Sequence, residues 1–484
     1  MILAMLIMTA VGCGSNDRNE KSSVSDSTPS GEESTAPEQN PDKVPDIDMN
    51  GFTLSILHNN PEKMTWTNMT LDVAEQTGEA FEEAIYKRNR KIESRFNCSI
   101  EVTEIGDDVF QIGNPEISKA VMSDDTTYDV WFPRDYNVIS SIPYLRPLSD
   151  LPYIDLDADE WFPLASSIYR FGDTQWAATS YFSLSMISRA AGFAFNKDIY
   201  ETIGAEKTPY EYVRDNEWTL DKLAEVARLG YFDMNGDGQI DKDDRFGIGS
   251  GWRELYMRFI LGSGVNFISR DADGMPEYIL PTDQIAIDKM QRIFELFNDK
   301  SIYYNRSKGD MNSVAAGLLE TGTNLFVISH PNAMCTKWRY LDADIGFVPC
   351  PKYESAQDRY YAPTYAGEMM VILQTLPEDR MENIGALLQA LSYAGMTDVL
   401  PVYRENSMKS KAARDEESEQ MFDIVVDSMS FDFGLIAWEQ VVNSIIQKIY
   451  ASGKGDVVSS LVTLKPNIEK VIASGIENIN GTAK

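Results

Sequence analysis

An alternation of strand-like and helix-like segments is the feature of this sequence that most restricts its fold. Residues 52–56 alternate apolar and polar side chains, with the period of two that is typical of a β-strand. Residues 78–96 place their apolar side chains on one helical face, and residues 100–102 are strand-like again. A helix around 117–122 and a buried strand at 128–132 follow. Because strands that alternate with helices usually pair in parallel, we expect an α/β fold.

The same alternation continues through the rest of the chain. Its 484 residues suit two domains of ordinary size or one large bilobed body. Thr219 is a good N-cap for a helix that reaches about Leu229, Pro377 opens another, and a strongly amphipathic helix is expected at 439–451. Further strands are expected at 192–195, 325–329, 345–348 and 369–373.

The N-terminus has the pattern of an export signal. Residues 1–8 are almost wholly apolar, but the run is too short to span a bilayer, which takes about 20 residues. Small residues then precede Cys13, an arrangement that resembles a bacterial lipobox. That resemblance implies that Cys13 is acylated and becomes the first residue of the mature protein; the alternative is an ordinary cleaved signal. Residues 14–50 are polar and predict a disordered tether.

Charge and residue counts exclude several functions. The chain has 75 acidic and 43 basic residues, a net charge of −32, which disfavours binding to nucleic acid. Its only histidines are His58 and His330, too few for a multi-histidine metal site. None of the four cysteines forms a CxxC pair, so a zinc ribbon or a thioredoxin-like site is not expected.

Residues 233–244 match the pattern of a calcium-binding EF-hand loop. Oxygen-bearing side chains stand at positions one, three, five, nine and twelve, Gly238 occupies the sharp turn at six, and the carbonyl of residue 239 falls at seven. Asp244 stands at position twelve in place of the usual glutamate. We expect one structural calcium ion; the alternative is an acidic turn without metal. The expected ligands are Asp233, Asn235, Asp237, Gln239, Asp241 and Asp244.

Several segments, in their order along the chain, resemble the bacterial extracellular solute-binding proteins of carbohydrate ABC transporters (family 1). They cover most of residues 52–440. The segments that carry the resemblance are the strand around Leu54, residues 78–96 with Tyr86, Arg88 and Asn89, Tyr128-Asp129-Val130, Phe195-Asn196-Lys197-Asp198, Trp218-Thr219-Leu220-Asp221, Ile345-Gly346-Phe347-Val348-Pro349 and Arg414-Asp415-Glu416-Glu417-Ser418.

The resemblance implies a two-lobed α/β fold of the periplasmic-binding-protein type II, with a hinge between the lobes. It places the first crossing between lobes near 176–192 and the return near 365–373. The expected organisation is a signal peptide at 1–12, a tether at 13–50, the first part of lobe 1 at 51–177, lobe 2 with the calcium-like loop at 178–365, the return part of lobe 1 at 366–410, and a C-terminal helical segment near the hinge and lobe 2 at 411–484.

In such a fold, loops at the carboxyl ends of the strands line the ligand crevice. Sugars stack their C–H faces on aromatic rings and pair their hydroxyls with polar groups. Residues of both kinds follow expected strands here, although each tryptophan among them could equally be a core residue. The candidate ligand-binding residues are Trp66, Asp129, Trp131, Trp252, His330, Glu368 and Trp438. We regard Trp218, at a helix start, as a packing residue.

The resemblance implies a binding protein without catalysis. It would be a monomer, anchored by lipid on the outer face of the cell membrane, that binds a sugar or oligosaccharide and delivers it to ABC permease subunits. A secreted glycoside hydrolase, which needs two carboxylates on either side of the scissile bond, stays an alternative. So does a surface sensing or adhesion protein, or a binding protein for a peptide or another small solute.

Overall fold

The computed structural model describes residues 40–62, 69–106, 112–305, 311–335, 338–406, 415–453 and 455–481. The chain divides into two units, Met1–Gln39 and Asn40–Lys484, and the description below concerns the second. Cys13 and Trp66 lie outside the described residues. Among the described residues, no helix combines the length and the apolar character that crossing a bilayer requires.

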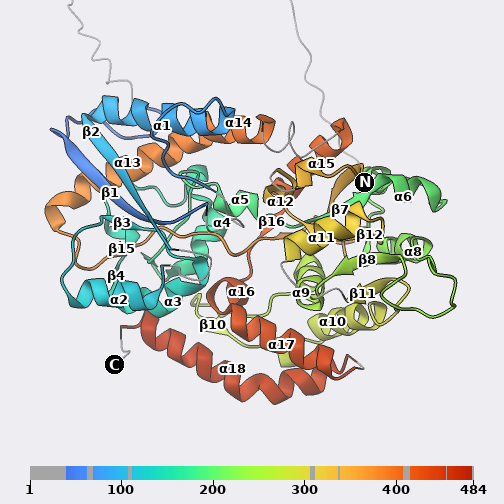
Figure 1. Ribbon diagram of the computed structural model, residues 1–484. Coiled ribbons are helices and arrows are strands. Elements are labelled where there is room, and N and C mark those ends of the chain that lie inside the picture. The colour runs from blue at the N-terminus through green and yellow to red at the C-terminus, as the bar shows by residue number, and fades with distance from the viewer. Residues whose placement is uncertain are drawn as a thin grey trace, which may run out of the picture. The chain divides into compact units, whose positions relative to one another are not determined.

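The first sheet contains the three strands expected from the N-terminal part of the sequence. Its order is β2-β1-β3, with β1 at Phe52–Asn59, β2 at Cys98–Ile105 and β3 at Val130–Trp131, and all pairs are parallel. The connecting helices are α1 (Ala80–Phe96) and α2 (Asn114–Met122) (Figure 1). We call the region around this sheet the first lobe. The predicted strand–helix alternation is therefore confirmed here.

The second sheet has five strands in the order β11-β8-β12-β7-β13, and it defines the second lobe (Figure 1). Here β7 runs antiparallel to both neighbours, whereas β8 is parallel to β11 and β12. The expectation of parallel pairing is thus wrong for β7. Since Gly192 pairs with Ser329, where β12 ends, β7 begins at the edge where its neighbours end. The strands are β7 (Gly192–Asn196), β8 (Phe246–Ser250), β11 (Tyr303–Asn305), β12 (Asn324–Ser329) and β13 (Ile345–Pro349).

Two segments predicted to connect the lobes run side by side. Ala178 and Met370 form an antiparallel bridge, and the next residue, Val371, bridges Trp131 in β3. The expected strand at 369–373 is therefore short: β15 covers Ile372–Leu373 and pairs with β4 (Leu145–Arg146). Met370 and Val371 extend the first sheet toward the segment that precedes β7.

Four C-terminal helices pack on both lobes. Helix α15 (Glu416–Asp427) contacts β13, and α17 (Glu439–Ala451) contacts α9 (Trp252–Gly262) of the second lobe. Helix α18 (Val457–Ile479) contacts α10 (Gln284–Leu296) but also α3 (Val138–Ser141) of the first lobe. With α16 (Phe433–Ala437), these C-terminal helices connect the two lobes (Figure 1). The C-terminal segment therefore packs on the first lobe as well as the second.

Most of the remaining elements are short, apart from helices α8, α11 and α13. Thr219 caps α8 as predicted, because its side chain accepts a hydrogen bond from the Lys222 N–H. The other helices are α4 (Pro163–Ser166), α5 (Ser185–Ser188), α6 (Lys197–Thr202), α7 (Pro209–Arg214), α8 (Leu220–Leu229), α11 (Met311–Glu320), α12 (Pro331–Cys335), α13 (Met381–Ala394) and α14 (Leu400–Val402). The other strands are β5 (Arg170–Phe171), β6 (Thr174–Gln175), β9 (Ser269–Arg270), β10 (Pro276–Glu277), β14 (Ala362–Pro363) and β16 (Met429–Ser430).

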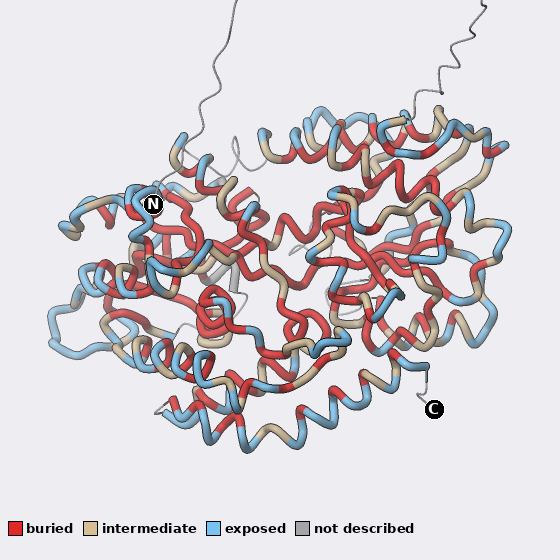
Figure 2. The backbone as a smooth tube through the Cα atoms, turned by 180° about the vertical axis from the view of Figure 1, so that it is seen from behind, coloured by how far each residue is buried: buried red, intermediate tan, exposed pale blue. Residues whose placement is uncertain are grey.

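Each lobe is built around buried strands, as the predominantly buried central backbone in Figure 2 shows. Every residue of β7, β8 and β13 is buried, because helices cover both faces of this mixed sheet. Trp218 is fully buried and its indole N–H donates to the Pro349 carbonyl, so its predicted packing role is confirmed.

Candidate functional site

Charged residues gather where the strands of both lobes end. Strand β8 leads into Trp252, Arg253 and Glu254, and β12 leads into His330. In the first lobe β3 is followed by Arg134 and Asp135. Loops at this edge are where ligands bind in open α/β sheets. We call the group the carboxyl-edge cluster: Arg134, Asp135, Arg189, Arg253, Glu254, Arg258, His330, Tyr365 and Glu439.

Glu254, in the first turn of α9, is the centre of an ion-pair network. The Tyr365 hydroxyl donates to its carboxylate at 3.0 Å, and Arg253 Nη2 donates to Oε1 at 2.8 Å. Arg258, one turn along the helix, places its Nε 3.8 Å from Oε2. Burial by itself would raise the pKa of Glu254, but Arg258, Arg253 and Tyr365 outweigh it and lower that pKa. Glu254 is therefore ionised at neutral pH.

Arg189 and His330 form the second part of the cluster. Arg189 Nη1 lies 2.9 Å from His330 Nε2, and since a guanidinium can only donate, the imidazole nitrogen accepts. Burial, followed by the nearby Arg189 and Arg258, lowers the pKa of His330 well below its ordinary value, so the ring is neutral. Burial also lowers the pKa of Arg189 to about 10, and Arg258 and Arg134 contribute in the same direction.

Asp135 links the first-lobe edge to the segment that returns from the second lobe. Its carboxylate accepts hydrogen bonds from the Tyr136 N–H at 2.9 Å and the Ala366 N–H at 2.7 Å. Ala366 has φ 63°, a left-handed conformation that non-glycine residues adopt at a cost. Burial raises the pKa of Asp135 to about 7. The carboxylate therefore holds a strained turn and titrates near neutral pH.

Two predicted ligand-binding carboxylates are engaged inside the first lobe. Asp129 is 1 % exposed and pairs with Arg380 at 2.6 and 2.7 Å. Glu368 is also 1 % exposed, and its oxygens lie 3.0 Å from His58 Nε2 and 3.2 Å from Asn59 Nδ2. Both carboxylates thus join strand ends to neighbouring segments.

The predicted tryptophans do not form one common surface. Trp131 is buried, with its ring edge-on to Tyr128 at 6.0 Å between centroids. Trp252 is half-buried at the start of α9 and stacks on Tyr450 at 5.1 Å and 8°. Trp438 is half-buried against Phe433, and a Cβ built on Gly475 of α18 would lie 2.4 Å from its ring. Trp252 directly precedes Arg253 and Trp438 directly precedes Glu439, so these two adjoin the cluster along the chain.

The calcium-like loop adopts a compact turn. Gly236 and Gly238 both have φ 73°, and Asp233 accepts the N–H groups of the two glycines at 2.7 and 2.9 Å. Asp244 is fully buried and accepts from the Tyr231 hydroxyl. Within the described ranges, no three His, Cys, Asp or Glu side chains are placed to hold a metal ion. Calcium binding at this loop stays a prediction.

The sequence prediction omitted most of the cluster. Arg253 and Glu254 directly follow Trp252, and Arg134 follows the predicted strand at 128–132. A search for charged residues immediately after each predicted strand would have identified these three. Arg189, Tyr365 and Glu439 follow no such pattern, because they reach the site from the crossing segments and from α17.

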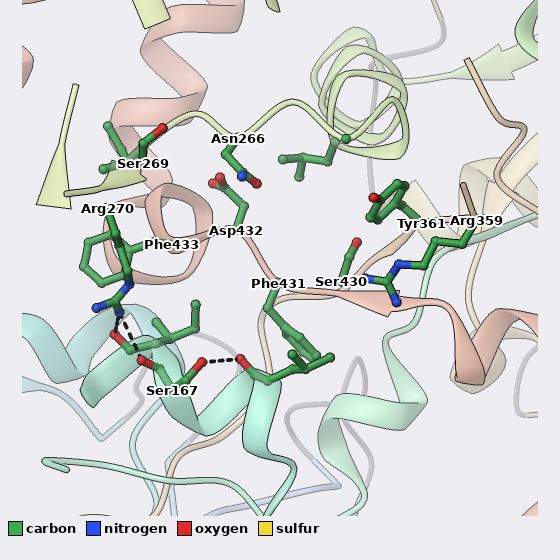
Figure 3. Close-up of a pocket in the computed structure, with 15 residues that line it drawn as sticks. Ser167, Asn266, Ser269, Arg270, Arg359, Tyr361, Ser430, Phe431, Asp432 and Phe433 are labelled. Carbon is green, nitrogen blue, oxygen red and sulfur yellow. Dashed lines mark hydrogen bonds between the residues drawn. The ribbon is translucent and has the colours of Figure 1, made fainter. Parts of the chain in front are cut away.

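A separate cavity of about 540 Å³ lies between the lobes near the other end of α9 (Figure 3). Helix α9 has 11 residues, so its ends are about 16 Å apart. Arg270 lines the cavity and donates to the carbonyls of Ser167 at 3.1 Å and Arg170 at 3.0 Å in the first lobe. Asp432 accepts the N–H groups of Phe267 at 2.9 Å and Leu435 at 2.6 Å. Arg270 and Asp432, two of the charged side chains of this cavity, are thus bonded to backbone.

No family model and no curated protein sequence matches this chain. Solved structures do match in three dimensions. A cyclic α-maltosyl-1,6-maltose binding protein from Arthrobacter globiformis has a TM-score of 0.59 at 13 % identity, over 87 % of this chain and 99 % of its own. An ABC substrate-binding protein from Listeria monocytogenes, in complex with cycloalternan, has a TM-score of 0.55 at 11 % identity, over 88 % and 100 %.

A third match shows that the fold carries other ligands. UgpB from Mycobacterium tuberculosis, in complex with glycerophosphocholine, has a TM-score of 0.51 at 16 % identity, over 82 % of this chain and 97 % of its own. The three neighbours are binding proteins, and the matches span nearly all of each. The chain therefore has the two-lobed α/β fold of ABC-transporter solute-binding proteins.

Proposed function

We propose that this protein is the extracellular solute-binding component of an ABC importer, and that it binds a sugar or oligosaccharide between its lobes. The observation that carries the proposal is the carboxyl-edge cluster, in which side chains of both lobes and of the crossing segments gather at the ends of β3, β8 and β12. The fold it shares with sugar-binding neighbours supports the same proposal.

The chemistry of the cluster suits a polyhydroxylated ligand. Guanidinium and carboxylate groups together offer donors and acceptors in fixed directions, as sugar hydroxyls require. Trp252 places an aromatic ring beside them, suited to stacking against the C–H face of a sugar ring. Closure of the lobes about the segments near Ala178 and Met370 would exclude water and strengthen these hydrogen bonds.

Thermal unfolding with a panel of oligosaccharides tests this proposal. Bound ligand stabilises the native state by mass action, so a ligand at 100 times its Kd adds about 2.7 kcal/mol. We expect a raised Tm, a change in tryptophan fluorescence and a smaller radius of gyration in X-ray scattering. Unchanged scattering at saturation would contradict closure. If a peptide rather than any sugar raises the Tm, the solute class is wrong.

An enzyme of the same fold is the second candidate. The structural neighbours are binding proteins, which favours binding without turnover. The purified protein should therefore leave chromogenic glycosides intact. Release of the chromophore, lost in a Glu254→Gln variant, would favour a hydrolase instead.

We also propose that Cys13 carries a lipid that anchors the protein outside the cell membrane, as the small residues before it indicate. Cys13→Ala should move the protein from the membrane fraction to the medium, measured by immunoblot of the two fractions. Cys98→Ala is the matched control and should leave it in the membrane fraction. Membrane association of the Cys13 variant would show that another feature anchors it.

For residues 233–244 we propose one structural calcium ion. Asp233, Asp237, Asp241 and Asp244 repel one another, and a hard divalent cation would offset that repulsion. A chelator should lower the Tm, and Asp237→Ala should abolish the response of the Tm to added calcium. Asp221→Ala, outside the loop, should retain the response. A Tm that is equal with calcium and with chelator would contradict the proposal, and loss of sugar binding on chelation would assign the metal to the ligand site.

A further inference from the structure

Two hollows adjoin each other at the C-terminal end of α9. The cavity of about 540 Å³ between the lobes and a smaller one of about 200 Å³ share Gly264 and Tyr361 in their walls. The larger volume falls in the range of about 300–1,000 Å³ that is typical of ligand pockets, and the smaller hollow extends it. We call the two together the α9-end groove. The length of α9, about 16 Å, separates it from the carboxyl-edge cluster.

Two charged side chains of the larger hollow have a structural role. Arg270 is bonded to carbonyls of the first lobe, and Asp432 accepts the backbone N–H groups of Phe267 and Leu435. These two side chains hold the walls in place, because a ligand could use them only by breaking those bonds. The polar groups that bind a ligand must therefore come from elsewhere in the lining.

Arg359 supplies such a group. Its guanidinium carbon lies 4.7 Å from the centre of the Tyr361 ring, and Figure 3 shows it directed toward Ser430. The ring itself is held, since the Tyr361 hydroxyl donates to Asp358 at 3.2 Å and a Cβ built on Gly264 would lie 3.5 Å from the ring. In the part of the chain that the structure describes, the guanidinium has no hydrogen-bond or ion-pair partner. Its N–H donors are therefore positioned by the ring and available to a ligand.

Other groups of the lining suit a sugar. The amide of Asn266 and the hydroxyl of Ser430 line the larger hollow, and neither has a partner among the described side chains and backbone. Each of these groups can both donate and accept a hydrogen bond. The half-buried ring of Phe431 lines the same hollow, and that of Tyr353 lines the smaller one. Apolar rings with a few placed donors and acceptors match the C–H faces and the hydroxyls of a saccharide.

The charge of the lining favours an uncharged ligand. Basic and acidic side chains are equal in number around the two hollows, three of each: Arg270, Lys289 and Arg359, and Glu354, Asp358 and Asp432. An anion in the groove would meet the carboxylates of Glu354 and Asp358 as well as the guanidinium of Arg359. Sugar hydroxyls avoid that repulsion, because they accept from a guanidinium and can donate to a carboxylate.

From this arrangement we infer that the α9-end groove is a second saccharide-binding site, which takes a linear, uncharged oligosaccharide. Arg359, Asn266 and Ser430 bind hydroxyl groups of the oligosaccharide. The rings of Phe431 and Tyr353 contact sugar units that lie in the two hollows. The site is additional to the proposed function, which assigns the imported solute to the carboxyl-edge cluster. The protein therefore binds two saccharides at once.

Calorimetry with maltopentaose, cellopentaose and xylopentaose tests the inference on the purified protein. We expect at least one of the three to bind in a step that Arg359→Ala weakens at least tenfold, because the substitution removes the donors of the guanidinium. Arg359→Lys keeps the charge but has fewer donors, so it should retain part of the affinity. Since Arg359 is exposed, the variants should fold as the parent does, which thermal unfolding checks.

Further variants place the binding step in the groove. Asn266→Trp fills part of the larger hollow and should also weaken the step at least tenfold. Arg228→Ala, at an exposed ion pair on α8, is the matched control and should change the affinity less than threefold. Trp252→Ala, at the carboxyl-edge cluster, should likewise leave this step within threefold.

The outcomes separate this inference from the proposed function. Oligosaccharide binding that Trp252→Ala weakens and both groove variants leave unchanged overturns the second site and supports the cluster. Binding that the groove variants weaken, with no saccharide that responds to Trp252→Ala, supports the groove and contradicts the site assigned in the proposed function. Absence of binding by all three pentasaccharides overturns the second site, whereas the thermal-unfolding panel decides the proposed function separately.

Discussion

The charged side chains near the two ends of α9 have different kinds of partner. At the N-terminal end, Arg253, Glu254 and Tyr365 bond to one another through their side chains. Near the C-terminal end, Arg270 donates to the carbonyls of Ser167, Ile168, Arg170 and Gly274. Its guanidinium also lies 4.5 Å from the centre of the Phe433 ring. Both regions contain half-buried arginines between the lobes, but their partners differ.

The difference teaches how to distinguish a binding site from a structural contact. A guanidinium whose donors are bonded to backbone carbonyls holds two segments together, and a ligand cannot use those donors without breaking that contact. Side chains that bond to one another can exchange partners when a ligand enters, because both partners can rotate. The cavity of about 540 Å³ has a suitable size for a ligand, yet two of its charged side chains, Arg270 and Asp432, are already bonded to backbone.

The largest expected effect is a loss of stability when Arg270, near the C-terminal end of α9, is replaced. Arg270→Met removes four hydrogen bonds to carbonyls. Because a typical intramolecular hydrogen bond contributes about 0.5–1.5 kcal/mol net, we expect the free energy of unfolding to fall by about 3 kcal/mol. Urea denaturation measures this, with Arg228→Met as control. Ligand affinity of the folded variant should stay within threefold; a larger loss would place ligand at this end.

An intermediate effect is expected at the other end of the helix. Trp252→Ala removes the ring beside the carboxyl-edge cluster and should weaken sugar binding about tenfold, or 1.4 kcal/mol. Calorimetry measures the affinity, and Trp252→Phe should recover part of it. Because Trp252 also stacks on Tyr450, Tyr450→Ala is the informative comparison. If both variants lower the Tm and neither changes affinity, Trp252 is a packing residue.

The smallest effect is a pH dependence shared by the two regions. Burial raises the pKa of Asp135 and of Asp432 to about 7, whereas an unfolded aspartate titrates near 3.9. The folded state therefore binds more protons than the unfolded state between about pH 4 and pH 7. Their contribution to stability is complete at low pH and is lost as pH rises through that window.

Asp432→Asn isolates this contribution, because the amide oxygen can still accept the Leu435 N–H. Relative to the parent, the Tm of the variant should improve as pH rises from 5 to 8. Asp125, whose pKa is lowered by hydrogen bonds from Thr127, provides the control. It is ionised in both the folded and the unfolded state above about pH 5, so the Tm difference between Asp125→Asn and the parent should stay constant from about pH 5 to 8. Parallel curves for the Asp432 variant and the parent would mean that Asp432 does not titrate in this range.

Local patterns determined the elements of this protein. The period of two in β1, the apolar face of α1, the cap at Thr219 and the bounds of α17 follow from the spacing of residues within each segment. Such patterns depend on neighbours along the chain, and they are therefore legible in one sequence. The order of these elements predicted an α/β fold, and the resemblance of several segments to solute-binding proteins implied the two lobes that the neighbouring structures share.

Only the tertiary structure decided which charges meet. Asp129 and Glu368 looked like ligand groups because they stand at strand ends, but Arg380 and His58 reach them from elsewhere in the first lobe. Arg189 and Glu439 reach the cluster from a crossing segment and from a C-terminal helix, although they are 250 positions apart in the sequence. Two residues that are far apart in the sequence can form an ion pair when the fold brings them together, so no local spacing predicts it. The direction of β7 was decided in the same way, by the edge at which the crossing segment enters the second sheet.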